Sequence, residues 1–286
     1  MAEGLLDPRT IRELAAELEL RPTKQRGQNF VHDPNTVRRI VTAAGIGPDD
    51  VVLEIGPGLG SLTLGLLEAA AEVVAIEIEH SLALRLPRTA DERLPRRSDR
   101  LRVIDADALA VDVLPDPQPT AVVANLPYNV SVPVLLHVLA RFPSVAKGLV
   151  MVQSEVADRL VAGPGSRTYG IPSVKLAWYA AARRVGSVPP TVFWPVPNVD
   201  SGLVELVRRD PPATTASRER VFGVVDAAFA QRRKMLRSAL AGLFGSSAAA
   251  SAALVRAGVD PQARGEILEV ADFARIAEVL DAEGVG

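Results

Sequence analysis

The chain passes from a strand pattern into a glycine loop at Val51-Val52-Leu53-Glu54-Ile55-Gly56-Pro57-Gly58-Leu59-Gly60. Residues 51–55 are apolar apart from one glutamate and rich in β-branched side chains, which is typical of a buried strand. The three glycines lack a Cβ atom, so the backbone can turn sharply and approach a ligand closely. Pro57 removes one amide donor, which suits a neutral amino-acid group better than a pyrophosphate. The stretch predicts a ligand-binding turn between a strand and a helix.

Further apolar runs of strand length follow, separated by segments of helical length, at 73–78, 101–104, 120–124 and 148–152. This alternation is typical of a parallel sheet covered by helices on both faces. The run 202–207 alternates apolar and polar residues and predicts a strand that closes the sheet edge. After Asp210-Pro211-Pro212 only helical patterns follow. We expect an α/β catalytic domain over residues 1–212, with 1–20 as an N-terminal extension, and a small α-helical C-terminal domain over 213–286.

The composition excludes several classes of protein. The chain has 286 residues, is 48% hydrophobic and contains no cysteine, which excludes disulfides, thiolate metal sites and cysteine nucleophiles. Its three histidines, His32, His80 and His137, are widely spaced, so we expect no metal site. No apolar run approaches the roughly 20 residues of a membrane span. We expect a soluble, cytoplasmic monomer that binds neither metal nor membrane.

The formal net charge of −2 gives no overall nucleic-acid signature, so such a partner would have to bind at local basic patches. Residues 21–40 carry five basic residues against one acidic residue, a net charge of +4. Residues 218–237 carry six basic residues against two acidic residues, which is also +4. Two solvated helix surfaces are the plain alternative.

Acidic residues follow the next two predicted strands. Glu77 lies 21 residues after Gly56, at the end of the following strand, where a carboxylate can accept hydrogen bonds from both hydroxyls of a ribose. Glu79 competes for this role, and a surface acid at a strand end is the alternative for Glu77. Asp107, after the third strand, could accept a hydrogen bond from an adenine amine or could simply cap a helix.

The tetrapeptide Asn125-Leu126-Pro127-Tyr128 directly follows the apolar run at 120–124. The lone pair of an exocyclic amine such as adenine N6 is delocalised into the ring. The Asn125 side-chain oxygen and the carbonyl of Leu126 or Pro127 can accept the two amine hydrogens and aim the lone pair at a methyl donor, and such alignment is a large part of catalysis. Tyr128 can stack on the base. An ordinary junction between a strand and a turn is the alternative.

Four motifs in order resemble those of the ribosomal RNA adenine N6,N6-dimethyltransferases: Lys24-Gln25-Arg26-Gly27-Gln28-Asn29-Phe30-Val31, Glu54-Ile55-Gly56-Pro57-Gly58, Asn125-Leu126-Pro127-Tyr128-Asn129 and Val192-Phe193-Trp194-Pro195-Val196-Pro197-Asn198-Val199-Asp200-Ser201. The resemblance covers the chain from residue 22 onward and implies a class I, Rossmann-like fold with S-adenosylmethionine as methyl donor. The stretches 153–160 and 164–170 are more similar to the KsgA (RsmA) subfamily than to the Erm resistance methyltransferases. This implies dimethylation of two adjacent adenosines in the 3′-terminal hairpin of 16S rRNA, within the small ribosomal subunit, and a role in small-subunit assembly.

The same resemblance implies roles for individual residues. The implied cofactor-binding residues are Asn29, Val31, Gly56, Gly58, Glu77, Asp107 and Asn125. The implied catalytic residues, which would hold the target amine and its base, are Asn125, Leu126, Pro127, Tyr128 and Phe193. By residue type alone, Phe193 fits a core position as well as a platform for the base. Gln25 stands where a lysine is common in the family and Val31 where a leucine is usual.

The candidate RNA-binding residues are basic: Lys24, Arg26, Arg167, Arg232, Arg233, Lys234 and Arg237. Apolar residues at helical spacing predict a buried stripe beside the last four, at Phe222, Val225, Phe229, Leu236, Leu240 and Leu243. A ridge that follows phosphates and a helix packed onto the first domain through arginine stems both fit this pattern. Arg167 lies in the loop 163–167, which binds phosphate or is a plain connection.

Other functions are separated from this one by their products. An Erm-type enzyme would modify 23S rRNA, and a DNA adenine methyltransferase would usually stop at one methyl group. The chain could also act mainly as a non-catalytic assembly factor of the small subunit. A nicotinamide dehydrogenase is disfavoured, because the third glycine of its fingerprint would fall at Ser61 and Pro57 removes an amide donor.

Overall fold

The structure, a computed structural model, describes residues 4–20 and 29–282. The chain forms two compact units. The first comprises Met1–Ala157 with Arg183–Arg208, and the second comprises Asp158–Ala182 with Arg209–Gly286. The sequence predicts a division at 212/213 instead, whereas residues 158–182 group here with the helical unit. The assignment of a function to each domain stays a prediction.

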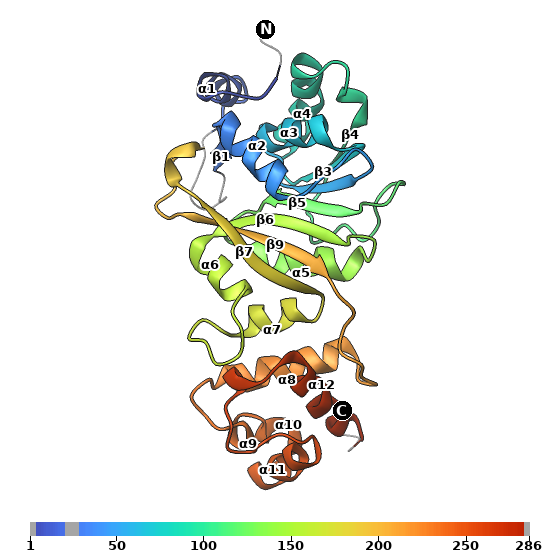
Figure 1. Ribbon diagram of the computed structural model, residues 1–286, viewed down its shortest axis with the longest axis vertical. Coiled ribbons are helices and arrows are strands. Elements are labelled where there is room, and N and C mark those ends of the chain that lie inside the picture. The colour runs from blue at the N-terminus through green and yellow to red at the C-terminus, as the bar shows by residue number, and fades with distance from the viewer. Residues whose placement is uncertain (1–3, 21–28, 283–286) are drawn as a thin grey trace. The chain divides into compact units, whose positions relative to one another are not determined.

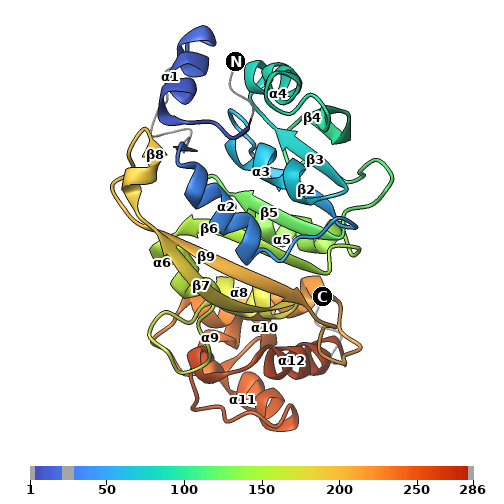
Figure 2. The same ribbon diagram turned by 45° about the horizontal axis from the view of Figure 1, so that its top comes forward.

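The first unit is built on one seven-stranded sheet. Its strands are β2 (Val51–Ile55), β3 (Glu72–Glu77), β4 (Leu101–Asp105), β5 (Ala121–Asn125), β6 (Lys147–Gln153), β7 (Ala180–Val188) and β9 (Ser201–Arg208). They lie in the order β4-β3-β2-β5-β6-β9-β7 (Figures 1 and 2). The first five run parallel, and β9 pairs with β6 in the antiparallel direction. The predicted α/β class is confirmed.

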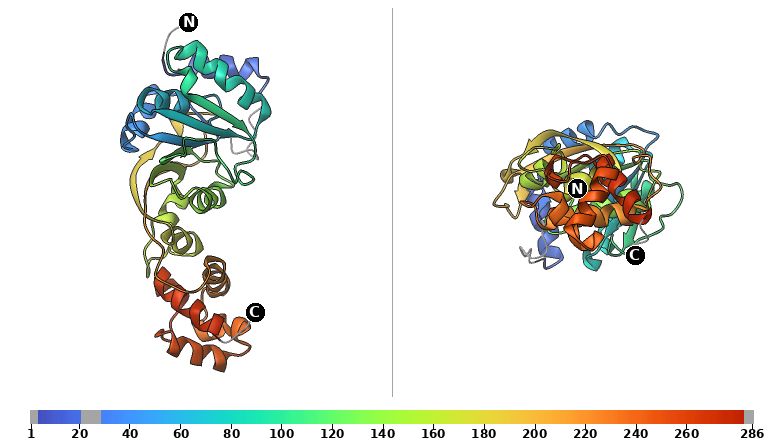
Figure 3. Two further views of the ribbon diagram at one scale, coloured as in Figure 1. Left: turned by 90° about the vertical axis from the view of Figure 1, so that its right-hand side faces the viewer. Right: turned by 90° about the horizontal axis from the view of Figure 1, so that it is seen from below.

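The central strands are buried on both faces, which explains their continuous apolar runs. Every residue of β2 is buried, including Glu54, and the first four residues of β5 are buried too. Helices cover both faces of the sheet (Figure 3, left): α2 (Pro34–Ala43), α3 (Ser61–Ala69), α4 (His80–Arg93) and α5 (Ser131–Arg141). The short 3₁₀ helix η2 (Ser98–Arg100) precedes β4. Because these strands are parallel, the loops that follow them all lie at the carboxyl ends of the strands.

The N-terminal extension folds as helix α1 (Pro8–Glu17), capped by the Asp7 carboxylate, which accepts a hydrogen bond from the Thr10 N–H at 2.7 Å. Its apolar side packs into a cluster with Phe30, Leu59 and Leu82. Helix α1 therefore contributes to the core of the first unit.

A second, two-stranded sheet joins β1 (Phe30–Val31) to β8 (Phe193–Trp194), with Val31 opposite Phe193. β8 follows the 3₁₀ helix η3 (Pro190–Val192). This ribbon brings the end of the first motif, at Phe30–Val31, beside Phe193–Trp194 of the last motif, although more than 160 residues separate them in the sequence.

The second unit contains helices α7 (Ile171–Ala177), α8 (Arg218–Ala230), α9 (Leu236–Ala239), α10 (Ala241–Phe244), α11 (Ser247–Arg256) and α12 (Val270–Ala282), with η4 (Gly265–Ile267). Helix α6 (Ser154–Leu160) spans the division between the units. The predicted stripe does not form one helix, because residues 231–235 interrupt it between α8 and α9. Val225, Leu236 and Leu240 are nevertheless buried, and Phe229 packs against the rings of Tyr169 and Phe273.

Candidate active site

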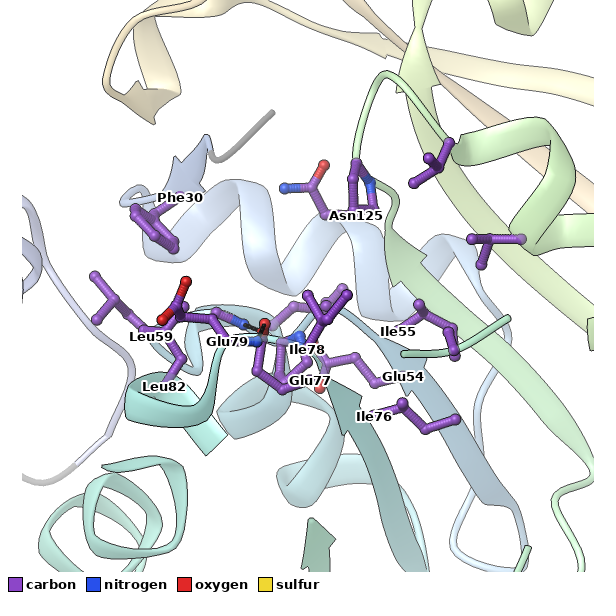
Figure 4. Close-up of a pocket in the computed structure, with 18 of the residues that line it drawn as sticks. Phe30, Glu54, Ile55, Leu59, Ile76, Glu77, Ile78, Glu79, Leu82 and Asn125 are labelled. Carbon is purple, nitrogen blue, oxygen red and sulfur yellow. Dashed lines mark hydrogen bonds between the residues drawn. The ribbon is translucent and has the colours of Figure 1, made fainter. Parts of the chain in front are cut away.

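A cavity of about 420 Å³ opens at the carboxyl ends of β2, β3 and β5. In an open parallel sheet this edge is where ligands bind, beside the point at which the strand order reverses. Here the chain proceeds outward from β2 to β3 and β4, and then returns to the other side of β2 as β5. Figure 4 shows the side chains of Phe30, Glu77 and Asn125 around this cavity.

The glycine loop forms one wall of the cavity. Gly56, Gly58 and Gly60 all have positive φ angles, of 67°, 59° and 96°. At Gly58 a Cβ atom would also lie 2.7 Å from the ring of Phe30, so a larger residue is excluded by steric overlap as well as by conformation. The predicted sharp turn therefore requires glycine at position 58, both for its positive φ angle and for its contact with Phe30.

Glu77 ends β3 and lies on the cavity floor with only 4% of its surface exposed. Its two carboxylate oxygens accept hydrogen bonds from the N–H groups of Gly58 and Glu79, each at 3.0 Å. Burial raises the pKa of Glu77 above its ordinary value, while these backbone donors act in the opposite direction. Each carboxylate oxygen keeps a further lone pair for a ligand hydroxyl. Glu79 also lines the cavity, but it lies beyond the strand end.

Glu54 is a second buried carboxyl group in the cavity wall. Burial raises its pKa to about 8, and the neighbouring Glu77 acts in the same direction. Among the residues that the structure describes, Glu54 Oε2 and Ser61 Oγ are buried without a hydrogen-bond partner, and both residues line the cavity. Buried polar atoms normally have partners, so these atoms are ready to accept hydrogen bonds from a donor-rich group such as an amine.

Asp107 follows β4 and lines the cavity. One of its carboxylate oxygens accepts the N–H of Leu109 at 2.9 Å, and its carbonyl accepts the N–H of Ala110 at the same distance. The residue therefore closes a turn, where the sequence allowed a helix cap, and no helix begins here. Ala106, Leu109 and Ile78 add apolar surface on which a flat ring can lie.

Asn125 is the last residue of β5 and projects into the cavity (Figure 4). Its side-chain Nδ2 donates a hydrogen bond to the Asn29 carbonyl at 3.0 Å. One of the two amide N–H donors is thereby engaged, and Oδ1 remains available to accept an amine hydrogen. Pro127 also lines the cavity, whereas the side chain of Leu126 is buried, so the tetrapeptide presents its polar and ring-constrained members to the site.

Besides Leu126, two residues predicted to hold the target base, Tyr128 and Phe193, lie outside this cavity. Tyr128 is half-buried, and its hydroxyl lies 2.9 Å from Ser201 Oγ. Phe193 is fully buried in the core cluster that includes Val31, because β8 pairs with β1 there. The next residue, Trp194, stacks on Phe30 with ring centroids 6.3 Å apart. The roles of Tyr128 and Phe193 beside a target base stay predictions.

Of the candidate RNA-binding residues, Lys24 and Arg26 lie outside the described residues. Arg233, Lys234 and Arg237 are exposed on the segment between α8 and α9 and at the start of α9. Arg232 instead binds within the second unit, because it pairs with Glu266 at 3.0 Å and donates to the Arg167 carbonyl at 2.7 Å. Arg232 is thus joined to the 163–167 loop by a hydrogen bond. RNA binding by the seven basic candidates stays a prediction.

Part of the cavity wall is formed by residues that the sequence does not single out. Phe30, Leu59 and Leu82 line the cavity and belong to the same cluster as the apolar side of α1 (Figure 4). Val130 and Val134 complete the wall from the start of α5. The spacing of the two valines, four apart after the tetrapeptide, is a signal of one helix face directed at the site. For the packing of α1 no local signal exists, since it joins segments distant in the sequence.

The cavity fits a ligand that carries a ribose, an amino group and a flat ring. Glu77 offers acceptors for hydroxyls, Glu54 and Ser61 offer acceptors for an amine, and the walls beside Asp107 are apolar. Across residues 4–20 and 29–282, no cluster of three or more His, Asp or Glu side chains is placed to hold a metal ion. Within the same residues, none of the helices has the length and apolar character needed to cross a membrane.

Comparisons with known proteins identify the family of the chain. A family model described as ribosomal RNA adenine dimethylase matches residues 20–282. The ribosomal RNA small subunit methyltransferase A of Cutibacterium acnes is 64% identical over 286 residues, which cover 98% of this chain and 96% of that protein. A crystal structure of a dimethyladenosine transferase from Plasmodium falciparum has the same fold, with a TM-score of 0.75, 23% identity, and coverage of 90% of this chain and 98% of that one. The 23S rRNA methyltransferase ErmE matches with a TM-score of 0.63 and 29% identity, over 88% of this chain and 100% of its own. The chain belongs to the ribosomal RNA adenine dimethylase family.

Proposed function

We propose that the chain transfers methyl groups from S-adenosylmethionine to N6 of two adjacent adenosines in the 3′-terminal hairpin of 16S rRNA, and that it takes part in small-subunit assembly. The observation that carries the proposal is the position of Asn125, which shares one cavity with the glycine loop and Glu77. The name of the Cutibacterium acnes relative supports the small subunit as the target. Identity to ErmE is much lower.

In this proposal the cofactor lies along the cavity floor. Glu77 accepts its ribose hydroxyls, Asp107 its adenine amine, and the Gly56–Gly58 backbone passes beneath its methionine part. Glu54 and Ser61, whose buried oxygens have no partner among the described residues, accept its ammonium group. When bound, the cofactor supplies a sulfonium methyl group for transfer.

The target adenine enters from the side of Asn125 and Pro127. The Asn125 Oδ1 atom and the carbonyl of Leu126 or Pro127 accept the two N6 hydrogens, which turns the nitrogen lone pair out of conjugation. The Asn29 carbonyl keeps the Asn125 amide in this orientation. No general base has to act before attack, because N6 becomes positively charged on methylation and is then acidic enough to lose its proton. The methylated N6 then loses a proton to solvent.

The experiment that tests the proposal is incubation of the protein with labelled S-adenosylmethionine and under-methylated small subunits, followed by mapping of the modified nucleotides. We expect label on two adjacent adenosines of 16S rRNA, recovered as N6,N6-dimethyladenosine. Free 23S rRNA serves as the comparison substrate. Label on 23S rRNA instead, or no label on either RNA, would exclude the proposed target.

A further inference from the structure

The ring of Tyr128 is fixed at its far end. Its hydroxyl lies 2.9 Å from Ser201 Oγ, a hydrogen-bond distance at which either oxygen can be the donor. Burial raises the pKa of Tyr128 above its ordinary value, and the group is a neutral phenol at physiological pH. Neither Tyr128 nor Ser201 lines the cofactor cavity.

Ser201 has a position set by the sheet. It is the first residue of β9, is fully buried and pairs with Gln153 of β6. The preceding carbonyl, of Asp200, accepts the Ser154 N–H at 2.9 Å. At Gly202 a Cβ atom would lie 2.5 Å from the Cβ of Ala157, so this strand end is closely packed. The Ser201 hydroxyl is therefore a rigid anchor.

The other end of the tetrapeptide is held by the neighbouring strand. Asn125 pairs with Met151 of β6, and the Leu126 N–H donates to the Met151 carbonyl at 3.0 Å. β6 thus holds the amide end directly and the ring end through Ser201 of β9. The position of the Tyr128 ring relative to the Asn125 amide follows from the pairing of β5, β6 and β9.

We propose that Ser201 is a positioning residue for the target base: its hydroxyl holds the Tyr128 ring in the plane on which the adenine stacks, while Asn125 grips the amine. This inference rests on the proposed function. Without this hydrogen bond the Tyr128 ring could rotate about its side-chain bonds, and the base stacked on it would meet the methyl donor at the wrong angle. A small error in angle or distance is costly in a reaction that depends on alignment.

Three variants separate this role from a general loss of structure: Ser201→Ala, Tyr128→Phe and the double variant. Each single change removes one partner of the same hydrogen bond. We expect kcat/KM for small subunits to fall about five- to tenfold in both single variants, the size of one ordinary hydrogen bond. The double variant should lose no more than either single variant, because the interaction is already broken. The dissociation constant of S-adenosylmethionine, measured by calorimetry, should stay within about twofold, since neither residue lines that cavity.

Ser154→Ala is the matched control. Ser154 lies at the same corner of β6 and β9, and its hydroxyl accepts a hydrogen bond from Arg184 rather than from Tyr128. We expect its kcat/KM to match wild type. Wild-type kcat/KM in Ser201→Ala, or additive losses in the double variant, would overturn the inference while leaving the proposed function intact.

Two further outcomes also decide the inference. A parallel loss of cofactor affinity in Ser201→Ala would show a structural role and overturn it as well. If Ser201→Ala fails to fold, an unchanged kcat/KM in Tyr128→Phe would overturn the inference in its place. A wild-type protein inactive on small subunits would instead overturn the proposed function, and this inference with it.

Discussion

Two buried carboxyl groups, Glu77 and Glu54, define the chemistry of the cavity at the scale of single residues. Both have raised pKa values because burial disfavours the charged form. They differ in their partners: Glu77 already accepts two backbone N–H groups, whereas Glu54 Oε2 has none among the described residues. Glu77 is therefore expected to bind hydroxyls as a carboxylate. The protonation of Glu54 is expected to change more than that of Glu77 when a ligand binds.

Replacement of Glu77 by Ala should weaken cofactor binding chiefly. Loss of hydrogen bonds to a charged group corresponds to an increase of roughly 10- to 100-fold in the dissociation constant of S-adenosylmethionine. Calorimetry measures this directly. Glu79→Ala is the control, since Glu79 lines the same cavity from beyond the strand end. A larger loss in Glu79→Ala than in Glu77→Ala would assign the ribose to the other acid.

Glu54 predicts a pH dependence of stability without ligand. Its pKa in the folded protein is about 8, against 4.5 for an unperturbed carboxyl group. Between these two values the unfolded chain has lost the Glu54 proton and the folded chain has kept it, so the free energy of unfolding should fall as pH rises. The slope from this group is about 1.4 kcal/mol per pH unit within that window.

The measurement is urea unfolding at several pH values for wild type and Glu54→Gln. The variant carries no titrating group at this position, so its stability should fall less steeply from about pH 5 to about pH 8. Identical slopes in the two proteins would show that Glu54 is already ionised in the folded state.

At the scale of secondary structure elements, helix α1 supports one wall of the cavity. Ile11 and Leu14 are buried against a cluster whose members Phe30, Leu59 and Leu82 also line the cavity. Arg85 ties the helix to α4 through Glu17, with Nε to Oε1 at 3.1 Å. The family model begins at residue 20, so this helix precedes the matched segment.

Leu14→Ala should therefore affect binding as well as stability. Truncation of a buried leucine costs about 2–5 kcal/mol in the free energy of unfolding. Because the cluster also lines the cavity, we expect the dissociation constant of S-adenosylmethionine to rise several-fold. Arg12→Ala, on the exposed side of α1, should change neither quantity. Reduced stability with unchanged cofactor affinity would separate α1 from the site.

The sequence predicts the central elements of this fold well and its edges less well. The runs that form β2, β3, β5 and β6 are continuous and apolar because those strands are covered on both faces, so the predicted bounds differ from the observed ones by one residue at most. β7 is absent from the prediction, since its alanines and arginines give no strand pattern. β1 and β8 have two residues each, too few for any periodic signal.

The residues of the candidate site also differ in how well the sequence predicts them. The residues predicted to bind the cofactor all line one cavity: Asn29, Val31, Gly56, Gly58, Glu77, Asp107 and Asn125. The predicted parallel sheet could bring most of them together, because Gly56, Gly58, Glu77, Asp107 and Asn125 end or follow parallel strands. Phe193 differs because its direction depends on pairing with Val31, which joins distant segments and which no local pattern encodes. The sequence does not predict the contacts of Ser201 or the packing of α1 for the same reason, because both join segments that are distant in the sequence.

For the whole molecule, the acidic net charge means that RNA binding must come from local basic surfaces. Arg233, Lys234 and Arg237 are exposed together in the second unit, whereas Arg232 is paired with Glu266. Substitution of those three exposed residues by Gln should weaken binding to small subunits and flatten its salt dependence. The slope should fall by about one unit for each phosphate group that the protein no longer neutralises.

Filter binding across a salt series measures this slope. Arg9→Gln, which replaces an exposed arginine of α1, is the control and should bind small subunits as wild type does. Equal slopes in the two variants would remove the segment that carries Arg233, Lys234 and Arg237 from the RNA-binding surface.

The central claim is that Asn125 grips the target amine beside a separately bound cofactor. Asn125→Ala tests it most directly, through the single-turnover rate of methyl transfer to under-methylated small subunits and the dissociation constant of S-adenosylmethionine by calorimetry. We predict a rate at least about 100-fold lower, because alignment is lost, with a dissociation constant changed by no more than about threefold, because Glu77 and the glycine loop remain. A preserved single-turnover rate with lost cofactor binding would contradict the account.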